Sequence, residues 1–356
     1  MASETDIADA ACYENNIENF AGTVKVPFGI AGPMRINGLH AHGDYFVPLA
    51  TTEAALVASY ARGAYVATRA GGISAAMLTE GVLRSPAFVF DNLLEAGQFV
   101  DWVAGNEIAL KTAAERTTRY GKLISIEPYI DGEIVFLLCR YTTGDASGQN
   151  MVTLATDALC RQIIEACPFK PRNWYIEGNF SGDKKATFLG LLTGRGRKVT
   201  ASIVLPKAHV KKYLRTTPAA MLDYAKVADL GARLSGQVGA QGHYANGLAA
   251  FYVATGQDVA CVSESAVGST RMDDRNGDLY MSVTLPNILV GSVGGGTGLP
   301  SQSAALSLLG LKGPGHAAAL AEIVAALCLC GEISIMAAIS TGQFTCAHDK
   351  LARGGK

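Results

Sequence analysis

The chain has 356 residues, of which 49% are hydrophobic and 17% are charged, and its net charge is -1 at pH 7. This composition indicates a globular protein with room for about two domains, and it lacks the basic footprint of a protein that binds nucleic acid or an anionic membrane. The eight cysteines lack the paired spacing of a zinc site or a disulfide framework, so we expect a reduced, cytoplasmic protein without a bound metal.

The first 50 residues predict little regular structure. Residues 1–16 are too polar for a signal peptide. Residues 14–50 carry glycines and prolines between short β-branched runs such as residues 23–26, a pattern that favours irregular strands.

The stretch 52–72 predicts a helix. Thr52 is a suitable N-cap, apolar residues follow at helical spacing, and a Gly-Gly pair at 71–72 ends the pattern. Glu53 then lies in the first turn, where the helix dipole alone favours a carboxylate. A catalytic role for Glu53 is the alternative.

A change of composition near residue 86 indicates a second unit. The predicted order is strand, helix, two strands, helix and strand, at residues 88–90, 95–119, 123–130, 133–140, 151–166 and 174–176. This is the order of a split βαβ, ferredoxin-like unit. We therefore expect an α+β protein in which a small domain, residues 86–176, is inserted between the two parts of a larger domain, residues 1–85 and 177–356.

The sequence GNFSGDKK at residues 178–185 is a polar turn ahead of a mostly apolar run. If Lys184 is partly buried beside a carboxylate, its ammonium is a preorganised cation that can stabilise an oxyanion. A solvated hairpin tip is the alternative. Just beyond it, Arg195, Arg197 and Lys198 alternate like the solvent face of a strand, so we expect them to be exposed.

The remaining chain predicts a larger α+β domain, with strands at 199–205 and 279–285 and a helix at 221–234. Three consecutive glycines at 294–296 permit close approach of a flat or phosphate-bearing ligand, although a glycine run outside the GxGxxG context is a weak signal.

An apolar run at residues 317–339 is long enough to span a membrane, but Glu322, Glu332 and Gly331 interrupt it. Two buried core helices explain this run better than a membrane span. His348 follows on a tail that could close over a site as a mobile acid. An ordinary exposed histidine is the alternative.

Seven stretches, taken together and in this order, resemble 3-hydroxy-3-methylglutaryl-coenzyme A (HMG-CoA) reductase, in particular the soluble catalytic portion of the class I type. They lie at residues 14–34, 48–59, 143–151, 178–185, 256–258, 290–302 and 334–348.

The resemblance implies that an acyl thioester is reduced to an alcohol in two hydride steps, as in the mevalonate pathway of isoprenoid biosynthesis. It makes Glu53 a proton donor and Lys184 the cation on the substrate oxygen. Asp258 couples to both groups, and His348 protonates the departing CoA thiolate.

The resemblance also implies a set of binding residues. Arg84, Asp183, Lys185 and Asn246 match residues that hold the acyl group, and Arg62 and His243 match CoA contacts. Cofactor contacts match Asp145, Asn150, Gly294, Gly295, Gly296, Thr118, Arg119 and Arg353, of which the two arginines and Thr118 favour NADPH over NADH. The stretch at residues 14–20 resembles a dimerisation motif, which implies a dimer or a dimer of dimers with shared sites.

The chain also departs from the family pattern. Glu177 stands where the family usually has a serine beside the substrate, Ser147 and Gln149 replace two methionines, and Cys261-Val262 replaces a Gln-Asn pair. A helical segment that usually precedes the catalytic core is nearly absent. A carboxylate at position 177 repels a substrate carboxylate at short range.

Three alternatives to HMG-CoA reduction follow. The first keeps the chemistry and changes the substrate to another acyl-CoA or a carrier-bound thioester. The second makes Lys184 the Schiff-base nucleophile of a lyase, and the third is a non-catalytic paralogue that only binds CoA or dinucleotide.

Overall fold

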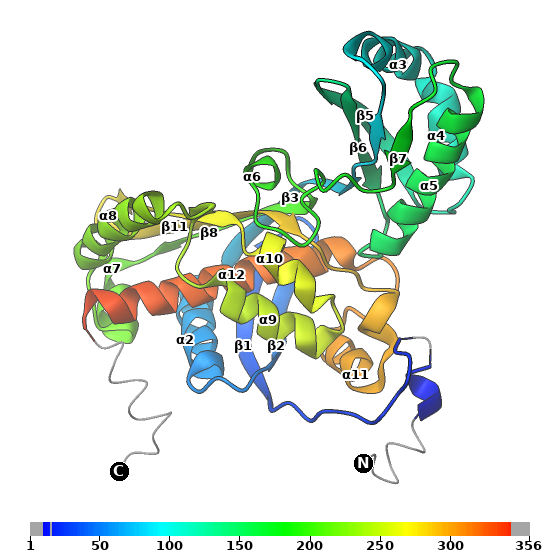
Figure 1. The fold of residues 1–356 in the computed structure, drawn as a ribbon. Helices are drawn as coiled ribbons and strands as arrows, with labels where there is room; N and C mark the ends of the chain where they lie inside the picture. The colour runs from blue at the N-terminus through cyan, green and yellow to red at the C-terminus, as the bar shows by residue number, and fades with distance from the viewer. Residues whose placement is uncertain (1–9, 15, 343–356) are drawn as a thin grey trace.

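The computed structural model describes residues 10–14 and 16–342, and it has a mixed α/β fold. A mixed sheet of 11 strands runs through the described part of the chain in the order β7-β4-β6-β3-β8-β11-β10-β9, while β1, β2 and β5 pair beside this path (Figure 1). The strands are β1 (Phe28–Gly38), β2 (His42–Ala50), β3 (Ile73–Arg84), β4 (Ala87–Val89), β5 (Lys122–Asp131), β6 (Ile134–Thr142), β7 (Asn173–Tyr175), β8 (Gly196–Leu205), β9 (Gly239–Ala240), β10 (Gly268–Arg275) and β11 (Asp278–Ile288).

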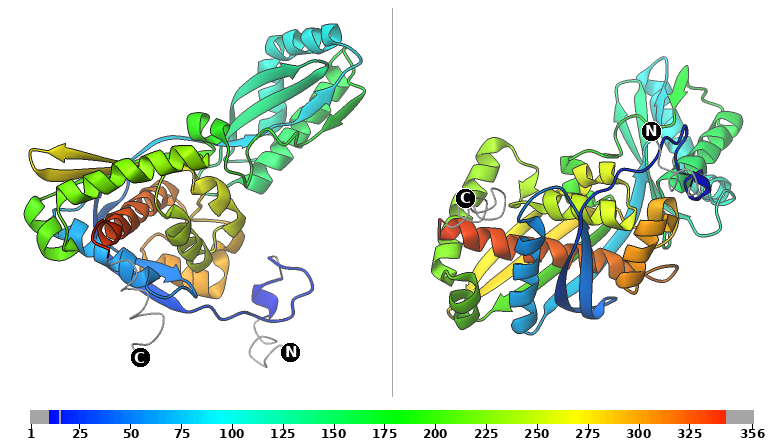
Figure 2. Two further views of the ribbon diagram at one scale, coloured as in Figure 1. Left: turned by 60° about the vertical axis from the view of Figure 1, so that its left-hand side comes forward. Right: turned by 90° about the horizontal axis from the view of Figure 1, so that it is seen from below.

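The helices divide between the two ends of this sheet (Figures 1 and 2). Three of them, α3 (Leu93–Gly105), α4 (Glu107–Glu115) and α5 (Gln149–Ala166), belong to the smaller part that projects from the molecule. The larger part holds α2 (Leu56–Arg69), α6 (Phe188–Thr193), α7 (Lys207–His209), α8 (Pro218–Ser235), α9 (Tyr244–Thr255), α10 (Val262–Ser265), α11 (Pro300–Leu308) and α12 (Ala317–Ser340). Short turns of other helix types are η1 (Ala10–Cys12), η2 (Val210–Leu214), η3 (Val259–Cys261) and η4 (Gly295–Gly298).

Helix α12 is the centre of the larger part, where it packs against α2, β3, β8 and β11. By length and composition it could cross a membrane, but 78% of its most apolar window is buried inside the protein, as expected of a core helix. It is one helix, so the prediction of two helices was wrong. Gly331 does not interrupt it, and the missing side chain leaves room for Tyr60: a Cβ at Gly331 would lie 2.5 Å from Tyr60 Cε1.

Strands β1 and β2 form an antiparallel pair with one irregularity, so the prediction of irregular strands was confirmed for residues 28–50. The register shifts between Ala31 and Met34, and Gly32, whose φ is 141°, lies in that irregularity. The Gly-Pro pair is thus absorbed by a local bulge while pairing continues on both sides.

Helix α2 begins at Leu56 rather than near Thr52, and its N-cap is Ala55 in the left-handed conformation with φ of 69°. The Thr51 hydroxyl accepts a hydrogen bond from the Glu53 amide at 3.0 Å. This local turn competes with a helical start, so Glu53 precedes the helix and the prediction that it lies in the first turn was wrong.

In the smaller part, β4 pairs antiparallel with β6 and β7, and β5 pairs antiparallel with β6. The predicted helix over residues 95–119 is two helices, so this prediction was wrong. The break falls at Asn106, whose side chain donates to the Trp102 carbonyl at 2.8 Å and so binds the backbone that a longer helix would use.

Candidate active site

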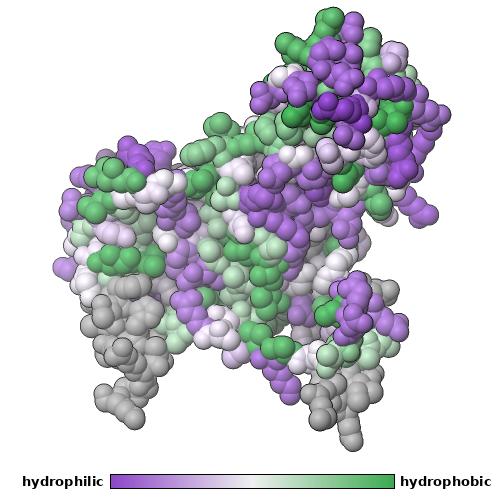
Figure 3. Space-filling view, in the orientation of Figure 1, coloured by the Kyte–Doolittle hydropathy of each residue, from purple (hydrophilic) through white to green (hydrophobic). Residues whose placement is uncertain are grey.

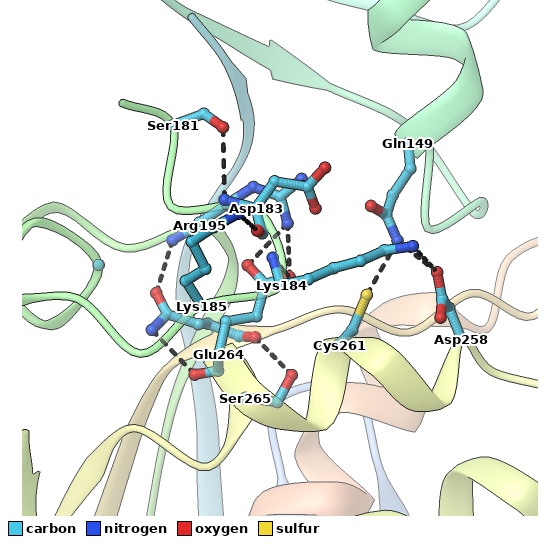
Figure 4. Close-up of polar contacts among 12 residues, drawn as sticks. Gln149, Ser181, Asp183, Lys184, Lys185, Arg195, Asp258, Cys261, Glu264 and Ser265 are labelled. Atoms are coloured by element: carbon cyan, nitrogen blue, oxygen red, sulfur yellow. Dashed lines mark hydrogen bonds and ion pairs between the residues drawn. The ribbon is translucent and has the colours of Figure 1, made fainter. Parts of the chain in front are cut away.

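The turn at residues 178–185 presents Lys184 at a fixed position (Figure 4). Lys184 itself has a left-handed backbone, with φ of 57°, which is uncommon for a side chain larger than glycine. Its amide donates to Glu264 Oε1 at 3.1 Å, which anchors the turn to α10. Its ammonium lies 2.9 Å from Asp258 Oδ2.

Asp258 receives donors on both carboxylate oxygens. Oδ1 accepts the Ala260 amide at 3.0 Å, and Oδ2 accepts the Gln149 amide nitrogen at 3.1 Å in addition to Lys184. Burial raises the pKa of Asp258, but Lys184 and the other donors outweigh it and hold the pKa below its ordinary value. The hydrogen bond that Lys184 donates to Asp258 raises the pKa of Lys184. A charged, oriented ammonium beside a partly open surface can stabilise a developing oxyanion.

Behind this pair, two arginines and three carboxylates alternate as Glu177, Arg84, Asp183, Arg195 and Glu264. Arg195 Nη1 lies 2.7 Å from Glu264 Oε2, and its Nη2 lies 3.0 Å from Asp183 Oδ1. Arg84 Nη1 lies 3.1 Å from Asp183 Oδ2 and 3.3 Å from Glu177 Oε2. Burial raises the pKa of Glu264 to about 6, although Arg195 opposes the shift.

Arg195 and Arg197 are only 1% and 3% exposed, so the prediction of a solvated basic strand was wrong for both. Arg195 is enclosed by carboxylates, and Arg197 donates to the carbonyls of Val290 and Gly144. Arg195 precedes β8, and Arg197 lies on the buried face of this strand with Val199.

Glu177 lies within the predicted acyl pocket. Besides Arg84, its Oε2 accepts the Ser181 hydroxyl at 2.9 Å and the Ser85 amide at 3.3 Å. Lys185, the last residue of the same turn, is exposed and donates to the Asp183 carbonyl at 3.0 Å. Arg84, which was predicted to bind a substrate carboxylate, thus already faces the carboxylates of Glu177 and Asp183.

Glu53 lies at the other end of helix α9. Its exposed carboxylate accepts the side-chain amide of Asn246 at 3.1 Å, in the first turn of α9. Asp258 follows the last turn of the same helix, and a helix of 12 residues is about 18 Å long. The structure therefore brings Glu53 to Asn246 and Lys184 to Asp258, at two separate points of one chain.

The two predicted CoA contacts gather around α12. Arg62 donates through Nε to the Ser334 hydroxyl at 3.1 Å. His243 Nδ1 lies 3.2 Å from Glu332 Oε1, and the imidazole stacks on Tyr60 with ring centroids 5.3 Å apart. Glu332 is fully buried and also accepts the Gly242 and His243 amides, so it fixes the start of α9.

Several predicted cofactor contacts lie around the loop before α5. Asp145 accepts the amides of Gly315 and Ala317, at the beginning of α12, and Asn150 is exposed in the first turn of α5. Among the described residues, a Cβ added at Gly294 or Gly295 would meet nothing within 4 Å, so this part of the chain leaves space open beside the glycine run.

The other predicted cofactor contacts are dispersed. Gly296 packs against Gly256, since a Cβ there would lie 2.8 Å from the Gly256 carbonyl oxygen. Thr118 donates to Met151 Sδ at 2.9 Å, and Arg119 beside it is exposed. His348 and Arg353 lie outside the described residues.

The residue-by-residue predictions missed Arg195, Glu264 and Glu332 as supports of the site. The local patterns around Arg195 and Glu332 indicated other roles, and only tertiary packing makes each of the three residues a partner of a site residue. Gln149 and Cys261 were noticed only as departures from a family pattern.

Comparisons with known proteins agree on the family. The sequence model of hydroxymethylglutaryl-coenzyme A reductase matches residues 2–353. A 3-hydroxy-3-methylglutaryl-coenzyme A reductase of Aeropyrum pernix is 43% identical over 96% of this chain and 83% of its own length. The corresponding protein of Methanothermobacter thermautotrophicus is 42% identical over 95% of this chain and 85% of its own length.

A solved structure has a similar fold. The class II reductase of Streptococcus pneumoniae, bound to NADPH, has a TM-score of 0.73 and 20% identity over 95% of this chain and 93% of that one. The family match and the relatives define this chain as an oxidoreductase. Within that class, it belongs to the HMG-CoA reductase family.

Proposed function

We propose that the chain reduces HMG-CoA to mevalonate and CoA by two hydride transfers from NADPH. The observation that carries the proposal is the ion pair of Lys184 with Asp258 at 2.9 Å, on a turn held to α10. Reduction of a thioester forms an alkoxide, and a preorganised cation at that position lowers the barrier.

The remaining roles in this proposal follow from the resemblance and the chemistry. Lys184 binds the substrate carbonyl oxygen, while Asp258 keeps the ammonium charged and oriented. Glu53 protonates the oxygen of the aldehyde as it is reduced. His348 protonates the CoA thiolate, which would otherwise add back to the aldehyde.

NADPH supplies the hydrides when bound, and features of the cofactor side fit such a ligand. Space is open beside Gly294 and Gly295, and the nearby Ser292 hydroxyl is buried without a hydrogen-bond partner among the described residues. Thr118 and the exposed Arg119 are proposed to meet the 2′-phosphate, with Arg353 of the tail as a further cation. NADPH in the pneumococcal structure supports the choice of a nicotinamide cofactor.

The smaller part is proposed to be the inserted dinucleotide-binding domain, over residues 86–176. Its four strands lie in the order β7-β4-β6-β5 and all neighbours are antiparallel. Along the chain, α3 and α4 connect β4 to β5, and α5 connects β6 to β7. This connectivity together with the spatial order supports a ferredoxin-like unit.

A dimer with shared active sites is part of the proposal. Glu53 and Asn246 lie at one end of α9 and Asp258 and Lys184 at the other, so a second copy is needed to bring the two pairs together. An apolar surface is available beside them, made of Val24, Phe28, Ile30 and Phe46, which are between 46% and 90% exposed. Hydrophobic side chains also gather on the central face where α9, β1 and β2 lie (Figure 3).

The test is nicotinamide absorbance with purified protein and HMG-CoA, in parallel reactions with NADPH and NADH. We expect two molecules of cofactor to be oxidised per free thiol released, with the faster rate for NADPH. A folded protein that oxidises neither cofactor would contradict the proposal.

Glu177 favours a second candidate, in which the same chemistry acts on an acyl thioester without a free carboxylate. Its carboxylate lies 3.3 Å from Arg84 Nη1, where it neutralises part of the charge that a substrate carboxylate would use. Glu177→Ser tests this candidate, with Glu177→Gln as a control that removes the charge and keeps the size. An increase of kcat/KM for HMG-CoA by about tenfold or more in both variants would favour the second candidate. An increase of less than about twofold would favour HMG-CoA.

A further inference from the structure

Gln149 links the cofactor side of the molecule to the lysine–aspartate pair (Figure 4). It is the first residue of α5, and its side-chain nitrogen donates to Asp258 Oδ2 at 3.1 Å and to Cys261 Sγ at 2.9 Å. Both hydrogens of the amide are therefore directed at the segment that carries Asp258.

The position of Gln149 is set by the loop that precedes it. The Thr143 hydroxyl donates to the Ala146 carbonyl at 2.9 Å, and the Asp145 carbonyl accepts the Ser292 amide at 2.9 Å. Gly291 allows the two segments to touch, since a Cβ there would lie 2.6 Å from the Ser147 nitrogen. The start of α5 is thus fastened to the larger part at the point from which Gln149 extends.

Gln149 completes the set of donors to Asp258. The Ala260 amide occupies Oδ1, while Lys184 and Gln149 share Oδ2. The side chains of Lys184 and Asp258 are each about 40% exposed, so water competes for the ion pair. The hydrogen bond from Gln149 therefore helps Lys184 to hold the carboxylate in place.

We propose that Gln149 is a positioning residue that orients the Asp258 carboxylate toward Lys184. It acts through Asp258 and does not itself meet the substrate. This inference rests on the proposed function for the role of the pair, but the orientation of the pair can be measured without turnover.

The residue types at positions 149 and 261 suggest which variants test this inference. Where the family pattern has methionine at 149 and glutamine at 261, this chain has Gln149 and Cys261, and the two side chains touch. Gln149→Met removes the donor at similar length. The double variant Gln149→Met, Cys261→Gln returns an amide beside Asp258 from the opposite side, and Cys261→Ala removes only the sulfur contact.

The first readout is the rate at which an amine reagent labels Lys184 at pH 8, measured by mass spectrometry. Asp258 raises the pKa of Lys184, so a misplaced Asp258 lowers that pKa and leaves more neutral, reactive amine. We expect faster labelling in Gln149→Met, a return toward the wild-type rate in the double variant, and little change in Cys261→Ala. Wild-type labelling in Gln149→Met would overturn the inference.

The second readout is the pH profile of kcat in the cofactor oxidation assay. Loss of a donor to Asp258 disfavours its ionised form, so the acidic limb of Gln149→Met should move to higher pH, with kcat lowered about tenfold and KM nearly constant. A loss of activity without a change of pH profile or Lys184 labelling would assign Gln149 a merely structural role. Absence of turnover in the wild type would contradict the proposed function alone, because labelling still tests Gln149.

Discussion

The guanidinium of Arg195 is enclosed by Glu264 and Asp183, and this pairing supports the turn that carries Lys184. Glu264 accepts Arg195 on both oxygens at 2.7 Å and the Lys184 amide at 3.1 Å. A buried charge that loses an ionic partner is unfavourable, so removal of Glu264 leaves Arg195 with Asp183 alone. The network therefore couples the stability of the larger part to the position of Lys184.

Glu264→Gln keeps the size of a neutral Glu264, so it should remove the pH dependence that this carboxyl contributes to the free energy of unfolding. The pKa of Glu264 is raised from 4.5 to about 6, so the folded state binds more protons than the unfolded state between these values. This carboxyl thus lowers the stability of the wild type as pH rises through that window.

Urea unfolding at pH 5 and pH 7 checks both statements. The stability of the wild type relative to Glu264→Gln should be greater at pH 5 than at pH 7. A difference that is equal at the two pH values, or smaller at pH 5, would contradict the assignment.

At the scale of elements, α2 and α12 cross with almost no space between their backbones. A Cβ at Gly63 would lie 1.9 Å from the Cys330 carbonyl oxygen, which belongs to the backbone of α12 and cannot turn aside. This close approach seats the helix that carries Arg62 against the helix that carries Glu332 and Ser334.

Gly63→Ala is expected to lower the free energy of unfolding by more than about 3 kcal/mol, because the two helices must separate. Gly231→Ala is the matched control, since this glycine lies within α8 and an added Cβ meets nothing within 4 Å. That substitution should stabilise the protein by about 0.5–1 kcal/mol. Equal effects in urea unfolding would refute the packing argument.

The sequence predicted elements where local signals and tertiary structure agree. The strand at 199–205, the helix at 221–234 and the four strands between residues 88 and 176 were confirmed because period and turn residues suffice there. It failed where side chains compete locally for the backbone, at Asn106 and at Thr51 before Glu53. The prediction also failed for α12, because the tertiary packing of a buried helix outweighs the low helix propensity of Gly331.

In the candidate active site, too, some features follow from the sequence and others depend on tertiary packing. Lys184 and Asp258, for which the family resemblance implied catalytic roles, form an ion pair, while those roles themselves stay predictions. The burial of Arg195 and the reach of Gln149 to Asp258 could not be predicted, because each depends on how separate loops cover the site.

At the scale of the whole molecule, α9 separates the two halves of the proposed catalytic set. Asn246, in the first turn of α9, donates a hydrogen bond to Glu53. Asp258, which follows the last turn of α9, forms the ion pair with Lys184. In the proposed dimer, each active site joins Glu53 of one protomer to Lys184 of its partner. Single variants of the two residues then damage opposite sides of the same site.

The most direct measurement mixes two inactive variants, Glu53→Gln and Lys184→Met, and follows NADPH oxidation with HMG-CoA. Random pairing makes half of the dimers mixed, and each mixed dimer has one intact site, so about a quarter of wild-type activity should return. A mixture of Lys184→Met with Asp258→Asn is the control and should stay inactive, because both changes lie on the same side. An inactive mixture of Glu53→Gln with Lys184→Met, in which mixed dimers are verified, would contradict a shared reductase site.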